Sequence, residues 1–155
     1  MRHAYAFTSR WHIAATREQC WAGLADALHT GPISWWPAVR VATAPAEITP
    51  GAVVVLEVRS PLGYRLRVRL TIVAVDPPTR LEATSSGDLA GIGILTLTDV
   101  PGATTLTWTW QVEVRRRWMR ATGAVLRPAF AAAHRAVMRR GEQGFAAYVA
   151  AAAPA

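Results

Sequence analysis

The sequence has no lysine, a single cysteine and no long apolar run, and the last two of these features each exclude a class of structure. All seventeen cationic side chains are arginine, and ten acidic residues leave a formal net charge of +7. Because Cys20 is alone, no internal disulfide can form, and we expect a reducing, cytoplasmic compartment. No stretch approaches the eighteen or more apolar residues of a membrane span, so no spanning helix is expected.

The sequence also lacks the motifs of several catalytic classes. Five side chains are of types that bind transition metals: His3, His12, His29, Cys20 and His134. None of them lies at the close spacing of metal ligands, so we predict no metal and no cofactor. No GxSxG motif is present, which excludes a serine hydrolase of that type. The first five residues carry no apolar stretch behind their charge, so we predict no secretory signal.

The length and the aromatic residues indicate what kind of domain this is. A chain of 155 residues predicts one domain over residues 1–155, with the alanine-rich end 150–155 as a frayed, disordered tail. Seven tryptophans accompany only three tyrosines and three phenylalanines. Because large flat side chains form walls well, this bias predicts that tryptophans line a cavity or groove.

Alternating apolar residues predict seven strands, separated by turn residues. They cover residues 4–14, 39–48, 52–60, 64–75, 80–88, 89–100 and 104–114. Most connections are too short for parallel crossovers, so we expect antiparallel neighbours. In the fourth strand, Tyr64, Leu66 and Val68 alternate with arginines at 65, 67 and 69. One face of the sheet should therefore be covered and the other wet.

Helical periodicity appears twice. Thr16 and Gln19 form a capping box that begins a helix ending near Leu28, and a short turn or helix carries Trp35-Trp36-Pro37. Beyond Arg115 the helical period returns, with a restart or kink at Pro128. Its apolar stripe comprises Phe130, His134, Val137, Met138, Gly141, Phe145 and Tyr148. The covered face of the sheet is the place where this stripe can be buried.

Several motifs along the chain resemble one known superfamily. They are Trp35-Trp36-Pro37, Gly87-Asp88-Leu89-x-Gly91-x-Gly93, Trp110-x-Val112, Trp118-Met119-Arg120, Arg127-Pro128-x-Phe130 and His134-x-x-Val137-Met138-Arg139-Arg140-Gly141-Glu142-x-Gly144. In their order and spacing, over about residues 5–149, the chain resembles the START-like (SRPBCC) superfamily. Within it, the chain is similar to the proteins labelled polyketide cyclase/dehydrase. A polar Asn often precedes the helix histidine in that pattern, and here this position is Ala133.

The resemblance implies an α+β helix-grip fold. It consists of a seven-stranded curved antiparallel sheet wrapped around a long C-terminal helix, with short helices after the first strand. Between sheet and helix it implies a deep, mostly apolar cavity that binds lipids, polyketides, sterols, hormones or aromatic compounds. The candidate ligand-binding residues are Trp36, Tyr64, Trp108, Trp110, Phe130, His134 and Met138. Each could instead be ordinary core, and His134 could simply bond a backbone carbonyl or a water.

Three functional hypotheses follow. The first is a protein that binds an apolar or aromatic small molecule, with His134 as polar anchor. The second is a cyclase/dehydratase in which His134 acts as acid and base near neutral pH. The third is an RNA- or ribosome-associated module that uses the exposed arginines at 65, 67, 69, 115–117 and 120. No aromatic residues interleave with the ladder of the fourth strand, so we expect solvated surface there, with RNA or an anionic membrane as the remaining possibility.

Overall fold

A computed structural model describes residues 4–154. Residues 1–3 and 155 lie outside the described part. The predictions about a signal at the beginning of the chain, about His3 and about the last residue of the tail therefore concern residues outside it. The elements are β1 (Ala4–Ile13), α1 (Arg17–Asp26), β2 (Gly31–Pro32), β3 (Val39–Thr43), β4 (Val53–Arg59), β5 (Arg65–Asp76), β6 (Arg80–Gly87), β7 (Leu89–Val100), β8 (Ala103–Val114) and α2 (Arg117–Ala152). This order of elements is that of the helix-grip fold.

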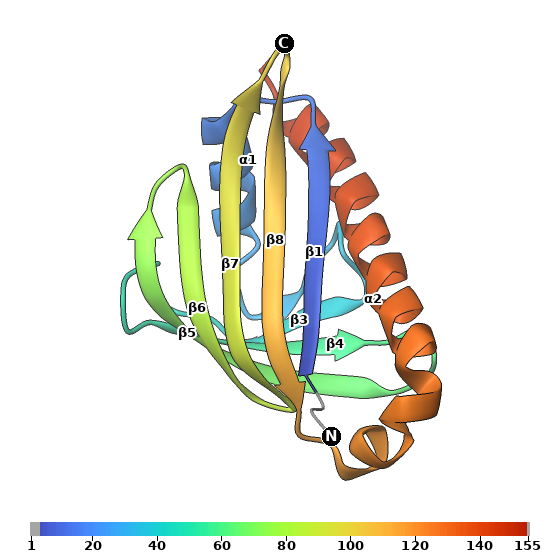
Figure 1. Cartoon of the computed structure of the whole chain (residues 1–155). Coiled ribbons are helices and arrows are strands. Elements are labelled where there is room, and N and C mark those ends of the chain that lie inside the picture. The colour runs from blue at the N-terminus through green and yellow to red at the C-terminus, as the bar shows by residue number, and fades with distance from the viewer. Residues whose placement is uncertain (1–3, 155) are drawn as a thin grey trace.

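The strands form one antiparallel sheet in the order β1-β8-β7-β6-β5-β4-β3-β2. Strands β3 and β4 run across the direction of β1, β7 and β8, and α2 lies along the side that the curved sheet encloses (Figure 1). The predicted alternation of β5 is confirmed, because Val68 and Ile72 are buried while the arginines between Tyr64 and Leu70 are exposed. The sheet therefore has one covered face and one wet face.

The segment between α1 and β3 forms turns, one of the two predicted alternatives, and it adds a strand to the seven predicted. The eighth strand is the two-residue β2, which pairs with β3, and the segment 33–38 is a pair of turns instead of a second helix. The amide of Trp36 donates to the carbonyl of Ile33 at 3.0 Å, and the amide of Val39 donates to the carbonyl of Trp36 at 2.9 Å. Pro37 disfavours a helical conformation at the residue before it and has no amide to donate, so a helix cannot propagate here.

Helix α1 begins at the predicted capping box. The amide of Gln19 donates to Oγ1 of Thr16 at 3.1 Å, and the amide of Thr16 donates to Oε1 of Gln19 at 2.9 Å. The helix ends at Asp26, slightly earlier than predicted. Its most buried residues are Cys20 and Gly23, and Trp21 is half-buried. Small residues carry little weight in an apolar pattern, so the sequence of this segment does not indicate its buried face.

Helix α2 is continuous over 36 residues with Pro128 inside it, and its beginning bends away from the long remainder (Figure 1). Proline removes one backbone hydrogen bond without ending the helix when packing holds both sides. The helix reaches Ala152, so residues 150–152 are helical and the predicted disordered tail is wrong there. Among residues 4–154 no helix combines the length and the apolar character needed to cross a bilayer.

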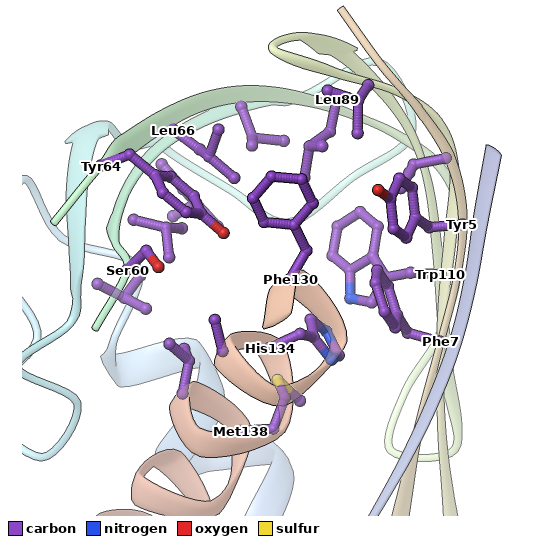
Figure 2. Close-up of a pocket in the computed structure, with 18 of the residues that line it drawn as sticks. Tyr5, Phe7, Ser60, Tyr64, Leu66, Leu89, Trp110, Phe130, His134 and Met138 are labelled. Carbon is purple, nitrogen blue, oxygen red and sulfur yellow. The ribbon is translucent and has the colours of Figure 1, made fainter. Parts of the chain in front are cut away.

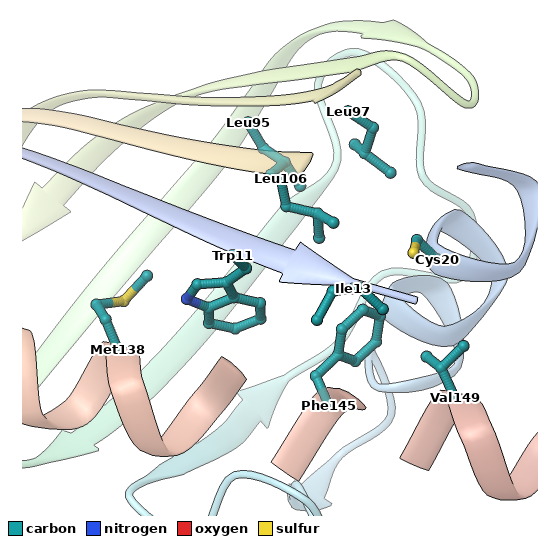
Figure 3. Close-up of a cluster of buried hydrophobic side chains, with 9 residues drawn as sticks. All are labelled: Trp11, Ile13, Cys20, Leu95, Leu97, Leu106, Met138, Phe145 and Val149. Atoms are coloured by element: carbon teal, nitrogen blue, oxygen red, sulfur yellow. The ribbon is translucent and has the colours of Figure 1, made fainter. Parts of the chain in front are cut away.

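The far end of the molecule from the start of β1 is densely packed. Its cluster comprises Trp11, Ile13, Cys20, Leu95, Leu97, Leu106, Met138, Phe145 and Val149, drawn in Figure 3. A Cβ built on Gly144 would lie 1.8 Å from the carbonyl oxygen of Trp35. Only glycine therefore allows the 33–38 segment to lie directly on α2.

Candidate ligand-binding cavity

A cavity of about 210 Å³ lies between α2 and the covered face of the sheet. Its walls come from β1, β3, β4, β5, β7, β8, α2 and the 33–38 segment. All seven candidate residues line it: Trp36, Tyr64, Trp108, Trp110, Phe130, His134 and Met138. Figure 2 shows side chains from the arched sheet and from α2 converging on this space. The geometry therefore brings the candidates together, and their role in binding stays a prediction.

Strand β8 supplies two indoles to the cavity wall. Trp108 and Trp110 share the inward face of the strand, as the alternation predicts, and both border the cavity. Trp110 pairs with Phe7 of β1 on one side and with Gly93 of β7 on the other. A Cβ on Gly93 would lie 3.0 Å from the Trp110 ring. Gly93 therefore provides the space in which this indole lies against the sheet.

Trp36 closes the cavity from the 33–38 segment. Its Nε1–H donates to the carbonyl oxygen of Val137 on α2 at 2.9 Å. The ring meets the ring of Trp11 edge-on, with centroids 5.3 Å apart. Trp35 instead lies against Phe145, at 4.8 Å between centroids. The two adjacent tryptophans thus pack in different places: Trp35 lies against Phe145, and the hydrogen bond holds Trp36 in the cavity wall.

His134 is the titratable imidazole of the cavity. Its ring stacks on Phe7 with centroids 4.1 Å apart and planes 14° from parallel. Burial lowers the pKa of His134 to about 4, and the positive charge of Arg135 contributes to the same shift. The imidazole is therefore neutral at pH 7, with one nitrogen as donor and one as acceptor. No carboxylate of residues 4–154 forms an ion pair with it.

The polar atoms of the cavity are few and uncharged. The hydroxyl groups of Tyr5, Ser60 and Tyr64 lie around the space together with His134 (Figure 2). The indole N–H of Trp108 is buried and has no hydrogen-bond partner within the described chain. Burial raises the pKa of Tyr5, so this phenol is also neutral at pH 7. None of the described lining residues is Arg, Asp or Glu.

Sequence reasoning did not name most of the apolar lining residues as candidates, and it also missed Tyr5, Phe7 and Ser60. Tyr5 and Phe7 alternate on one face of the first strand, which was a usable signal. Their place depends on the pairing of β1 with β8, which sets Phe7 beside Trp110. Ser60 follows β4 at a turn, and nothing in a turn residue indicates that it faces a cavity. No group of three or more potential metal ligands occurs within residues 4–154.

The sequence pattern of one protein family, described as polyketide cyclase / dehydrase and lipid transport, matches residues 5–150. The chain belongs to this family. The match spans nearly all of the described residues and both sides of the cavity, and it confirms the resemblance drawn from the motifs. No curated protein sequence matches the chain.

Solved structures share the fold of this family member. The protein TTHA0849 from Thermus thermophilus has a TM-score of 0.72 and 16% identity, over 97% of this chain and 100% of that one. The di-domain ARO/CYC BexL from the BE-7585A biosynthetic pathway has a TM-score of 0.67 and 17% identity, over 95% of this chain and 50% of that one. Ara h 8.0201 has a TM-score of 0.63 and 16% identity, over 96% and 99%. At these identities the likeness establishes the helix-grip fold alone.

Proposed function

We propose that the protein binds a small, uncharged, aromatic or otherwise apolar molecule of lipid- or polyketide-like chemistry in the cavity between sheet and α2. The observation that carries this proposal is a space of about 210 Å³ whose described walls hold no formal charge. A carboxylate there would lose its hydration without gaining a cation, because His134 is neutral at pH 7. The ligand should therefore be neutral.

The volume limits the size of the ligand. An apolar protein cavity of roughly 150 Å³ holds benzene, whereas pockets for drug-sized molecules are roughly 300–1,000 Å³. A cavity of about 210 Å³ lies between these values. A compound of one or two rings suits it, and a longer acyl or polyketide chain would require the walls to move apart.

The uncharged polar groups of the wall allow one polar atom in the ligand. The hydroxyl groups of Tyr5, Ser60 and Tyr64 and the neutral imidazole of His134 can each donate a hydrogen bond. A ketone or ether oxygen is a suitable acceptor and carries no charge. We therefore favour a ligand with one such oxygen.

The test uses two probes of almost equal shape, 2-acetylnaphthalene and 2-naphthoate, measured by titration calorimetry. The neutral ketone should bind, and the anion should bind at least tenfold more weakly. Ala133 lines the cavity and Ala132 is exposed on the same helix, so Ala133→Phe should abolish binding and Ala132→Phe should not. Binding of both probes with equal affinity, or binding that survives Ala133→Phe, would contradict the proposal.

A cyclase/dehydratase is the second candidate, because the family description includes that activity and His134 lies in the wall. In such an enzyme His134 would accept and return the proton of a folded polyketone. A base whose pKa is about 4 is mostly unprotonated at pH 7 but draws a proton weakly. His134→Ala separates the two candidates. It should abolish turnover of a polyketone substrate in an enzyme, and change affinity only modestly in a binding protein.

A further inference from the structure

The beginning of α2 exposes an unusual concentration of apolar surface. The described residues contain six large apolar side chains that are exposed: Leu62, Val73, Ile92, Trp118, Val125 and Leu126. Three of the six fall within the first ten residues of α2. Val125 is 81% exposed and Trp118 is 41% exposed. Single exposed apolar residues are ordinary, whereas a cluster on one element indicates a contact surface.

The spacing of these residues makes them a second stripe on the helix. Met119, Gly123 and Phe130 form the buried face. Trp118, Ala121, Thr122 and Val125 follow the i, i+3, i+4, i+7 pattern on another side of the helix. We call these four residues the outer stripe. Three of them are apolar. Apart from the ring contacts of Trp118 with Tyr64 and Phe130, the packing of this part of α2 onto the sheet comes from the buried face.

The charge around the outer stripe is of one sign. Residues 114–141 contain no acidic residue and eight arginines: Arg115, Arg116, Arg117, Arg120, Arg127, Arg135, Arg139 and Arg140. Arg116 pairs with Asp88 at 3.0 Å, and Arg127 lies 4.4 Å from the centre of the Tyr5 ring. Three exposed arginines next to the outer stripe form no ion pair within residues 4–154: Arg115, Arg117 and Arg120. Their charge is available to an external anion.

The outer stripe also contacts residues that line the cavity. The ring of Trp118 lies 5.4 Å from that of Tyr64 and 6.0 Å from that of Phe130, and both of these residues line the cavity. The beginning of α2 lies at the end of the sheet where β1 begins (Figure 1). A partner that contacts Trp118 therefore lies one side chain away from the space proposed for the ligand.

We propose that the outer stripe and its arginines dock on the surface of an anionic lipid bilayer. A helix that lies in a membrane interface carries an apolar face with Trp or Leu and a polar face rich in Arg or Lys, as this segment does. Arg side chains can cover apolar surface while their charged ends reach the phosphates. A second copy of the chain is a poorer partner, because its eight arginines would face these eight. The proposal concerns the outer surface and does not depend on what the cavity holds.

The first test measures cosedimentation with vesicles. We expect binding to vesicles made of equal parts of phosphatidylcholine and phosphatidylglycerol, and little binding to phosphatidylcholine alone. Val125→Glu should weaken binding to the mixed vesicles at least fivefold, because it places a like charge in the apolar contact. Val73→Glu is the matched control, since Val73 is 49% exposed on β5, and it should change nothing. Equal binding to both kinds of vesicle, or equal effects of the two substitutions, would overturn the proposal.

The second test separates a membrane from nucleic acid. Arg120→Gln should weaken vesicle binding about fivefold, the usual contribution of one arginine near an anionic surface. Arg69→Gln removes an exposed arginine from the sheet and should leave binding unchanged within about twofold. The competing partner is tested with polyuridylate. If polyuridylate binds more tightly than the mixed vesicles and Val125→Glu leaves that binding unchanged, the arginines serve RNA and the membrane proposal fails.

Discussion

One sheet and one helix enclose two very different interiors. At one end Trp11, Phe145 and Val149 pack with almost no exposed surface (Figure 3). At the other end Trp110, Phe130 and His134 surround open space (Figure 2). Both interiors use the same strands β1 and β8 and the same helix α2. Apolar composition therefore does not decide which end is filled.

The difference lies in the number of layers that cover the sheet. At the packed end α1 adds Cys20, and the 33–38 segment adds Trp35 and Trp36. At the cavity end α2 faces the sheet without α1, and the 33–38 segment contributes only Trp36 to the wall. A sheet and a single helix diverge when the sheet curves, so an uncovered part of the interior stays open unless side chains reach across it. The cavity is thus a consequence of where the additional segments stop.

The largest expected difference between the two ends comes from removing one phenylalanine at each. Phe145→Ala should lower the free energy of unfolding by about 4 kcal/mol, because the ring is surrounded on all sides. Phe130→Ala should lower it by about 2 kcal/mol, because part of that ring faces space already empty. Urea denaturation with equal m-values checks both. Equal losses would mean that the cavity end is packed as tightly as the other.

Acidification should weaken the cavity end selectively. The pKa of His134 is about 4 in the folded protein and about 6.5 when unfolded, so the unfolded chain binds the proton more tightly. The contribution of the neutral His134 to the free energy of unfolding is complete above the pKa that this residue has in the unfolded chain. It is lost as the pH falls toward the pKa of His134 in the folded protein. Between about pH 7 and about pH 5 the loss should be about 2 kcal/mol.

His134→Leu is the control for that pH dependence. It removes the imidazole and keeps an apolar side chain against Phe7. Denaturation curves at several pH values should then show a smaller decrease in stability than the wild type over the same range. If the two proteins lose the same stability, carboxylates elsewhere account for the acid sensitivity and His134 is not desolvated as its position implies.

Patterns local to one strand or helix predicted most of the fold. Alternation assigned the inward faces of β5 and β8, and with them Tyr64, Trp108 and Trp110, because successive side chains of a strand point to opposite sides. The helical period assigned Phe130 and His134 to one stripe in the same way. The capping box was also correct, since its two hydrogen bonds join residues three apart.

Features that depend on distant pairs escaped prediction. The contribution of Phe7 depends on the pairing of β1 with β8, and these strands are separated by most of the chain. The turns of segment 33–38 lie on α2 because Gly144 leaves room for the Trp35 carbonyl, which no local pattern indicates. Contacts made across the molecule decided each of these.

Gly93→Ala has the smallest expected effect on stability, and it tests whether Trp110 borders open space or belongs to a packed core. In Gly93→Ala the new methyl would lie 3.0 Å from the Trp110 ring, which must move. Because Trp110 borders open space, the ring can shift inward, and stability should change by only about 1 kcal/mol. Binding of 2-acetylnaphthalene should nevertheless fall, since the ring takes up room the probe needs. Ala90→Val on the outward face of β7 is the matched control and should leave binding intact. A large loss of stability in Gly93→Ala with unchanged binding would show that Trp110 belongs to a packed core, and the two ends of the interior would no longer differ.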